Sequence, residues 1–274
     1  MKQFKHIITS GCSFSDIRNN ITWPLHLGAT FDIEATHTGL ASQSNGLIAR
    51  KAIHAVHQAL KKNVAPEDIL VGIMWSGTDR HDMYFSWMNS QLDEEVKRID
   101  TMLINPTTFV TNDAGGWLIM NHHWNEKYNK IYYSHFHDSV YQRVLTYEKV
   151  LWTQNYLKNL GVNYFMSSIT DDVFCLPDDI ANNPNLTWLV EQVDQEKFLP
   201  VSSIHSWTKK YWTDADFPAI TVELSDGTVV KVPDTHPTRD MHVRFVKEVI
   251  LPYIKETMPE YNCPEFKEFI SEHI

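Results

Sequence analysis

The stretch Ile69-Leu70-Val71-Gly72-Ile73-Met74-Trp75 is the strongest apolar run in the chain, and it constrains the fold more than any other segment. A short, uncharged run of this kind predicts a strand buried on both faces, as in a parallel sheet. Residues 4–9 and 31–35 are shorter strand candidates. From Ser44 onward, one helical face is apolar, formed by Leu47, Ile48, Ala52, Ile53, Val56 and Leu60. The alternation of strands and helices predicts a doubly wound α/β sheet.

The rest of the chain continues this alternation in several places. We expect a short helix from Trp23-Pro24, with proline in its first turn. A long helix is expected over 140–160, ended by Gly161 as its C-cap, and a fourth strand over 162–167. Residues 220–232 predict a hairpin around Ser225-Asp226-Gly227. A closing helix is expected over 239–257.

The region from Arg80 to Tyr133 interrupts the alternation. It contains a turn signal, Asn112-Asp113-Ala114-Gly115-Gly116, and an aromatic cluster from Trp124 to Tyr133. We interpret residues 80–137 as an aromatic-rich insertion or lid near the carboxyl edge of the sheet. The excess of Trp, Tyr and His over residues 75–153 fits either an aromatic-lined surface or a thick layer of core packing.

Composition limits the classes of protein to consider. A chain of 274 residues suits a single domain over 1–274 that carries the insertion. Its net charge of −10, from 24 Lys and Arg against 34 Asp and Glu, predicts no nucleic-acid partner. No apolar run is long enough to span a membrane, so no membrane partner is expected. The start of the chain runs into a strand without a cleavable apolar region, so we expect a cytoplasmic location. Three cysteines are too few and too scattered for a disulfide framework or a zinc knuckle.

Two short segments at opposite ends of the chain carry residues suited to nucleophilic catalysis. Gly11-Cys12-Ser13-Phe14-Ser15 follows the first predicted strand, so Ser13 would project its hydroxyl at the carboxyl edge of the sheet, where α/β sheets place ligands. Asp234-Thr235-His236-Pro237 supplies an imidazole with a carboxylate two residues before it. Together the segments contain the parts of an activated serine nucleophile.

Four segments in order resemble the sequence blocks of the SGNH (GDSL-like) hydrolases. The nucleophile block is Gly11 to Ser15, and the second block is the turn Gly39-Leu40-Ala41-Ser42-Gln43-Ser44-Asn45. The third is Ser76-Gly77-Thr78-Asp79-Arg80, and the last is Asp234 to Pro237. The four blocks span nearly the whole chain. With Trp23-Pro24 and His242, the set is similar to a divergent subset in phage and marine bacterial proteins, for which the location would be the host cytoplasm if the protein is phage-encoded.

The resemblance implies a flavodoxin-like three-layer α/β/α fold with a mostly parallel central sheet. It makes Ser13 the nucleophile, His236 the general base and Asp234 the carboxylate that orients the imidazole. The backbone N–H groups of Ser13 and Ser42 would hold the oxyanion. The remaining candidates for oxyanion or substrate binding are Asn45, Gly77, Thr78, Asp79 and Arg80. No metal or organic cofactor is implied.

Three departures from the family pattern bear on this expectation. Cys12 replaces the usual aspartate beside the nucleophile. Asp234 precedes His236 by two residues rather than three, so a turn must aim its carboxylate. Asp79 replaces the asparagine that donates to the oxyanion, and an ionised aspartate cannot donate. Asp79 could stay protonated, it could turn away to pair with Arg80, or Ser76 or Thr78 could donate in its place.

Several residues have alternative interpretations. Cys12 is a rival nucleophile, Ser15 is expected to be a helix N-cap, and Asn45 is either a cap or a polar group in the site. His242 is expected to pack or hydrogen-bond in the closing helix. A metal site, aromatic packing or substrate stacking could explain His122, His123, His135 and His137.

Three functions are compatible with these residues. The favoured one is an esterase acting on a small-molecule or carbohydrate ester, such as an O-acetyl group on a sugar. The second is an O-acyltransferase on the same scaffold. The third is a non-catalytic binding or assembly protein.

Overall fold

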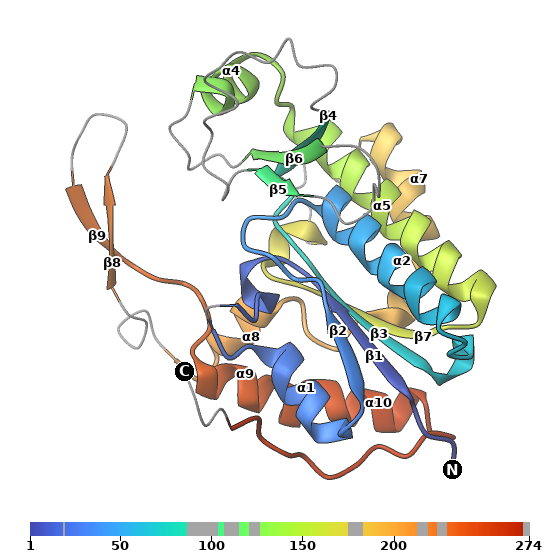
Figure 1. Cartoon of the computed structure of the whole chain (residues 1–274). Coiled ribbons are helices and arrows are strands. Elements are labelled where there is room, and N and C mark those ends of the chain that lie inside the picture. The colour runs from blue at the N-terminus through green and yellow to red at the C-terminus, as the bar shows by residue number, and fades with distance from the viewer. Residues whose placement is uncertain are drawn as a thin grey trace.

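The computed structural model describes residues 1–18, 20–86, 104–106, 115–120, 127–174, 183–212, 219–223 and 229–270. At its centre lies a parallel four-stranded sheet with the strand order β2-β1-β3-β7 (Figure 1). The strands are β1 (His6–Ser10), β2 (Glu34–His37), β3 (Ile69–Trp75) and β7 (Asn163–Ser168). The predicted α/β sheet is therefore present.

Strand β3 is the buried central strand that its sequence predicts. All of its residues are buried, and it pairs in parallel with β1 on one side and β7 on the other. Gly72 has a packing role there, because a Cβ atom on it would lie 2.6 Å from the Phe165 ring and 3.0 Å from the Trp23 ring. The absence of a side chain at Gly72 thus lets two aromatic rings close over the sheet.

Helices lie on both faces of the sheet, an arrangement compatible with a three-layer α/β fold (Figure 1). On one face, α2 (Asn45–Lys61) packs beside α5 (Ser139–Leu160). The other face carries α1 (Trp23–Phe31), α9 (Arg239–Phe245) and α10 (Leu251–Thr257). A π-helical turn, Val246–Ile250, joins α9 to α10 just before Pro252, whose nitrogen cannot donate a helical hydrogen bond. Two further helices are α7 (Pro184–Gln192), which packs against α5, and the short α8 (Ile204–Thr208).

The ends of two elements show how local sequence sets their boundaries. Helix α5 ends at Gly161, which adopts the left-handed conformation with φ of 75°, as its C-cap prediction requires. The second strand lies later than predicted, because α1 continues through Phe31 and ends at Asp32 with φ of 53°. The prediction of a strand over 31–35 is therefore wrong at its start, and Ile33 leads into β2.

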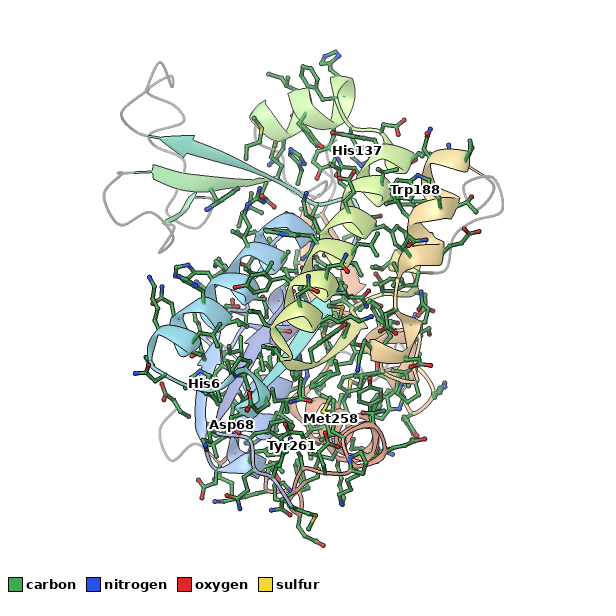
Figure 2. All side chains as sticks on the ribbon, turned by 90° about the vertical axis from the view of Figure 1, so that its right-hand side faces the viewer. His6, Asp68, His137, Trp188, Met258 and Tyr261 are labelled. Carbon is green, nitrogen blue, oxygen red and sulfur yellow. The ribbon has the colours of Figure 1, made fainter. Side chains whose placement is uncertain are left out.

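The segment after α10 returns to the beginning of the chain. The Tyr261 ring stacks on Phe4 with ring centroids 4.2 Å apart, and its hydroxyl donates to the Glu67 carbonyl at 2.7 Å. Figure 2 shows Met258, Tyr261 and Asp68 at the end of the molecule opposite His137. These contacts hold the closing helices against the amino ends of the strands.

The described parts of the 80–137 region form a second, antiparallel sheet. Its strands are β4 (His81–Ser86), β6 (Gly115–Met120) and β5 (Ile104–Pro106), followed by α4 (Lys127–His135). The Tyr133 hydroxyl donates to the carbonyls of Asp79 and Met120, at 2.6 and 3.1 Å. Residues 112–114 and Trp124 lie outside the described residues, so a lid over the sheet stays a prediction.

The hairpin predicted over 220–232 is present as the antiparallel pair β8 (Ala219–Glu223) and β9 (Val229–Pro233). Its turn, Ser225-Asp226-Gly227, lies outside the described residues. Among the helices that the structure describes, none combines the length and the apolar composition needed to cross a membrane.

Candidate active site

A tight turn after β1 presents Ser13 at the carboxyl edge of the sheet. The strand ends at Ser10, and residues Ser13–Ser15 form a single turn of 3₁₀ helix. A Cβ atom on Gly11 would lie 2.3 Å from the Ser15 hydroxyl, so the turn needs glycine there. Ser13 is partly exposed, whereas Cys12 is fully buried in the core. The burial of Cys12 removes it as a rival nucleophile.

Ser15 stabilises the turn from its buried side. It is buried, it is the last residue of the 3₁₀ turn, and its hydroxyl accepts a hydrogen bond from the Trp23 indole at 2.9 Å. The prediction of Ser15 as a helix N-cap is therefore wrong, because the chain leaves the turn in an extended conformation at Asp16. Trp23 and Ser15 together tie α1 to the Ser13 turn.

Several close contacts fix the loop after β2 against the Ser13 turn. A Cβ atom on Gly39 would lie 2.2 Å from the Ser15 carbonyl oxygen, so only glycine allows this approach. The Gln43 amide donates to the Gly11 carbonyl at 2.6 Å, and the Asp16 carboxylate accepts the Ala41 N–H at 2.9 Å. Burial opposes ionisation of Asp16, but hydrogen bonds from Arg18 and Ala41 outweigh it and hold the pKa of this carboxyl below its ordinary value.

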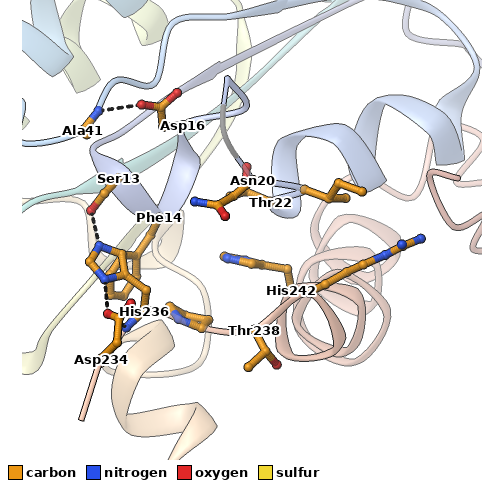
Figure 3. Close-up of a pocket in the computed structure, with 13 residues that line it drawn as sticks. Ser13, Phe14, Asp16, Asn20, Thr22, Ala41, Asp234, His236, Thr238 and His242 are labelled. Atoms are coloured by element: carbon orange, nitrogen blue, oxygen red, sulfur yellow. Dashed lines mark hydrogen bonds and ion pairs between the residues drawn. The ribbon is translucent and has the colours of Figure 1, made fainter. Parts of the chain in front are cut away.

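Ser13, His236 and Asp234 form a continuous chain of hydrogen bonds (Figure 3). The Nε2 atom of His236 lies 2.8 Å from the Ser13 hydroxyl oxygen, and its Nδ1 atom contacts the Asp234 carboxylate. The same carboxylate oxygen accepts the backbone N–H of His236 at 3.0 Å. This local turn, of the kind that aspartate makes with the backbone two residues on, aims the carboxylate across the shortened spacing.

The segment that carries His236 lies between β9 and α9. Helix α9 begins at Arg239, and the Thr238 hydroxyl accepts the Met241 N–H at its N-terminus. The buried Pro237 and the ring of Phe14, whose centroid lies 4.9 Å from that of the His236 ring, limit where the imidazole can lie. The His236 side chain is 48% exposed, so solvent reaches it.

A pocket of about 410 Å³ opens beside these residues, and we call it the Ser13 pocket (Figure 3). Ser13, His236 and Asp234 line one part of this pocket. The segment before α1 and the start of α9 line another part. Its lining consists of Ser13, Phe14, Asp16, Asn20, Ile21, Thr22, Ala41, Asp234, His236, Pro237, Thr238, Arg239 and His242. Sequence patterns did not indicate Asp16, Asn20 or Thr22, although Asp16 follows Ser13 closely in the nucleophile turn.

Backbone donors for an oxyanion are present near Ser13. Within the described part of the chain, the backbone N–H groups of Ser13 and Ser42 have no hydrogen-bond partner. Ser42 adopts the left-handed conformation with φ of 66°, which is strained for a residue other than glycine. Its neighbour Ala41 lines the pocket, while Ser42 itself does not.

The third sequence block lies outside the Ser13 pocket. The Asp79 carboxylate folds back over Gly77, since a Cβ atom on Gly77 would lie 2.7 Å from Asp79 Oδ1. Among the described residues, Asp79 forms no ion pair with Arg80. Gly77, Thr78, Asp79 and Arg80 do not line the Ser13 pocket, and Arg80 lines a separate one.

Asn45 also lies apart from the Ser13 pocket. It is the first residue of α2, after the N-cap Ser44, and its side-chain amide makes structural hydrogen bonds. It accepts the Ser76 N–H at 2.8 Å and donates to the Ser76 carbonyl at 3.0 Å and to the Thr146 hydroxyl at 3.1 Å. Asn45 thus clamps the end of β3 to α2 and α5, and it lines the same separate pocket as Arg80.

Two of the four histidines considered for a metal, His135 and His137, lie within the described residues. Among the described residues there is no group of three or more His, Cys, Asp or Glu side chains arranged to hold a metal ion, and His122 and His123 lie outside those residues. His137 packs against Tyr132 and Tyr133, with ring centroids 6.3 and 5.1 Å apart, which is aromatic packing.

Comparison with known proteins adds no family to this description. No protein-family model matches the chain, and no curated protein sequence is significantly similar to it.

Proposed function

We propose that this protein is a serine esterase of the SGNH type, with Ser13 as nucleophile, His236 as general base and Asp234 as the orienting carboxylate. The observation that carries the proposal is the continuous hydrogen-bond chain from Ser13 through His236 to Asp234. The sheet order β2-β1-β3-β7 supports it, because doubly wound sheets of this order bind ligands beyond the carboxyl end of the first strand, and the Ser13 turn follows that end of β1.

In the proposed reaction, the Ser13 oxygen attacks the ester carbonyl while His236 Nε2 takes the hydroxyl proton. Asp234 accepts from Nδ1 and stabilises the imidazolium that forms. The imidazolium then protonates the leaving alcohol, and the acyl group stays on Ser13. His236 then deprotonates a water molecule, which attacks the acyl-enzyme. As the bond to Ser13 breaks and the acid is released, the His236 imidazolium returns the proton to the Ser13 oxygen.

The oxyanion of each tetrahedral intermediate would accept hydrogen bonds from the backbone N–H groups of Ser13 and Ser42. One such donor typically contributes about 3 kcal/mol, or roughly 10²–10³ in rate. Two features support this assignment. Both groups lack a partner in the described part of the chain, and the Asp79 carboxylate lies over Gly77 instead of lining the pocket, where its charge would oppose the oxyanion.

Exposure of the site favours hydrolysis over transfer of the acyl group. Acyl transfer requires that water be excluded from the acyl-enzyme. The His236 side chain is 48% exposed, so water can approach the base that would activate it. An O-acyltransferase would instead need a covering segment over this imidazole.

Replacing Ser13 tests the proposal directly. Turnover of 4-nitrophenyl acetate should fall by at least about 10³-fold in Ser13→Ala, while the circular dichroism spectrum and Tm stay close to those of the parent protein. The control is Ser139→Ala, an exposed serine at the start of α5, which should keep full turnover. Unchanged turnover in Ser13→Ala would remove Ser13 from the mechanism.

A further inference from the structure

A second pocket, of about 370 Å³, lies where the antiparallel sheet meets the first turns of α2 and α5 (Figure 1). We call it the Arg80 pocket. It shares no lining residue with the Ser13 pocket. A cavity of this volume suits a small organic ligand. Its lining consists of Ser44, Asn45, Gly46, Arg50, Arg80, His81, Asp82, Trp117, Tyr141, Gln142, Leu145, Thr146 and Lys149.

The lining of the Arg80 pocket carries more positive than negative charge. Arg50, Arg80 and Lys149 contribute three cations against the single carboxylate of Asp82, which leaves a surplus of two positive charges. His81 adds no charge near neutral pH, because burial lowers the pKa of its ring below 6.5. Across the part of the chain that the structure describes, none of the three cations forms an ion pair. In a chain whose acidic residues outnumber its basic ones, such a group of cations favours an anionic ligand.

The carboxylate of Asp82 is engaged with the start of α2. Its Oδ1 atom accepts the Leu47 N–H at 3.1 Å, so Asp82 already occupies the N-terminus of this helix. A Cβ atom on Gly46 would lie 3.0 Å from the same Oδ1 and 3.5 Å from Arg50 Nη1, so glycine lets both groups approach this turn. Burial raises the pKa of Asp82 to about 6, which leaves the carboxyl group mainly ionised at pH 7.5. A ligand anion must therefore be held by the side-chain cations and not by the helix N-terminus.

The three cations line the pocket from three different elements. Arg50 comes from α2, Lys149 from α5, and Arg80 from the connection between β3 and β4. The Arg50 guanidinium lies 4.9 Å from the centroid of the Trp117 ring, a cation–π contact that restrains the side chain. Arg50, Arg80 and Lys149 are each partly exposed. The Nη1 atom of Arg80 is buried, so Arg80 contributes mainly its charge, whereas Arg50 and Lys149 can donate hydrogen bonds to a ligand.

We propose that the Arg80 pocket binds a small phosphate monoester, with Arg50 and Lys149 donating to the phosphate oxygens. A phosphate monoester carries a charge of about −1.5 to −2 at pH 7, which matches the surplus of the lining, whereas one carboxylate neutralises only half of it. The planar fork of an arginine fits two phosphate oxygens at once, and a lysine binds phosphate as a point charge. Tyr141 and Leu145 offer apolar surface to the organic part of the ligand. The inference does not depend on Ser13 and goes beyond the proposed esterase activity.

Isothermal titration calorimetry at pH 7.5 with phenyl phosphate, benzoate and benzyl alcohol tests the charge preference in the parent protein. Phenyl phosphate should bind with a Kd of about 1 mM or below. Benzoate should bind at least about fivefold more weakly, and benzyl alcohol more weakly still. The affinity for phenyl phosphate should also fall as the NaCl concentration rises, because salt screens the cations. Benzyl alcohol binding as tightly as phenyl phosphate, or no binding of phenyl phosphate up to about 10 mM, would overturn the proposal.

Charge-removing variants locate the bound phosphate. Lys149→Gln should weaken the binding of phenyl phosphate about tenfold, and Arg80→Gln/Lys149→Gln should weaken it further. The matched control is Lys158→Gln, an exposed lysine later in α5, which should keep the affinity of the parent protein. Equal affinity in the folded double variant and the parent protein would overturn the proposal.

Hydrogen–deuterium exchange of the parent protein gives the same answer without a variant. Phenyl phosphate should slow exchange in peptides that cover residues 44–50 and 141–149, the segments of α2 and α5 that line the Arg80 pocket. Slowed exchange at residues 234–242 instead, in the lining of the Ser13 pocket, would contradict the proposed site.

Discussion

The Nε2 atom of His236 lies 2.8 Å from the Ser13 hydroxyl oxygen, although 223 positions separate the two residues in the chain. Ser13 is fixed by the turn after β1, and His236 by the start of α9. Helix α9 packs against α1, and α1 is tied to the Ser13 turn by the Trp23–Ser15 hydrogen bond. The pairing therefore depends on a packed path between the two ends of the chain, rather than on one flexible contact.

Removal of the imidazole should abolish turnover without loss of the fold. In His236→Gln, kcat for 4-nitrophenyl acetate should fall by roughly 10³–10⁴-fold, because His236 is the one side-chain partner of the Ser13 hydroxyl among the described residues. The His236 side chain is 48% exposed, so the change in Tm should be small. Replacement of the exposed His57 on α2 by Gln is the control and should keep full activity.

Asp234→Asn should separate the negative charge of the carboxylate from its role in the local turn. An amide oxygen can still accept the His236 backbone N–H, so the turn should persist. The neutral amide no longer stabilises the positive imidazolium that forms when His236 takes the Ser13 proton, so kcat should drop by roughly 10²–10⁴-fold. The double variant with His236→Gln should be no slower than His236→Gln alone, because the two residues act as a unit. Activity within threefold of the parent protein would rule out this role for Asp234.

Two glycine substitutions should differ sharply in their effects. A Cβ atom on Gly39 would lie 2.2 Å from the Ser15 backbone oxygen, so Gly39→Ala must shift the turn that carries Ser13. We expect a loss of roughly 1–3 kcal/mol of stability, measured by urea unfolding, together with a loss of turnover. Gly28→Ala, inside helix α1, is the matched comparison. Its Cβ atom would lie 3.5 Å from the Ala35 Cβ atom, which is an ordinary van der Waals distance. It should be neutral or stabilising, and equal effects at the two sites would contradict the described approach of the two loops.

Buried histidines should make the fold sensitive to mild acid. Burial lowers the pKa of His26 to about 4, below its ordinary value of 6.5. Between about pH 6.5 and pH 4, His26 is therefore protonated in the unfolded chain and neutral in the folded chain. The free energy of unfolding falls as the pH falls through this window. One such group contributes a slope of at most about 1.4 kcal/mol per pH unit.

His26→Gln tests that contribution, because glutamine does not titrate and can still accept the Phe269 N–H that His26 Nδ1 accepts. The free energy of unfolding, plotted against pH from 4.5 to 7.5, should rise less steeply in the variant than in the parent protein. Parallel curves would show that His26 is not buried in its neutral form.

Much of the sheet could be predicted from the sequence, because its signals are local. The uncharged run Ile69–Trp75 predicts a buried strand wherever it lies, and Gly161 ends its helix by its own conformational freedom. The start of β2 was predicted too early, because the left-handed conformation of Asp32 that ends α1 has no reliable sequence signal. Local signals therefore locate elements better than they locate their boundaries.

In the candidate site, too, some features could be predicted from the sequence and others could not. Ser13, His236 and Asp234 could be predicted from short motifs, and the structure brings them together. The position of Asn45 depends on tertiary contacts with Ser76 and Thr146, and no spacing along the chain encodes those contacts.

The most direct test of the account is covalent labelling with a fluorophosphonate probe, followed by peptide mass spectrometry. An activated serine attacks such a probe, whereas an ordinary serine hydroxyl does not. We predict stoichiometric modification of Ser13 in the folded protein, and its loss in His236→Gln and after unfolding in urea. A folded protein whose Ser13 remains unmodified, or is modified equally well without His236, would contradict the proposed catalytic pair.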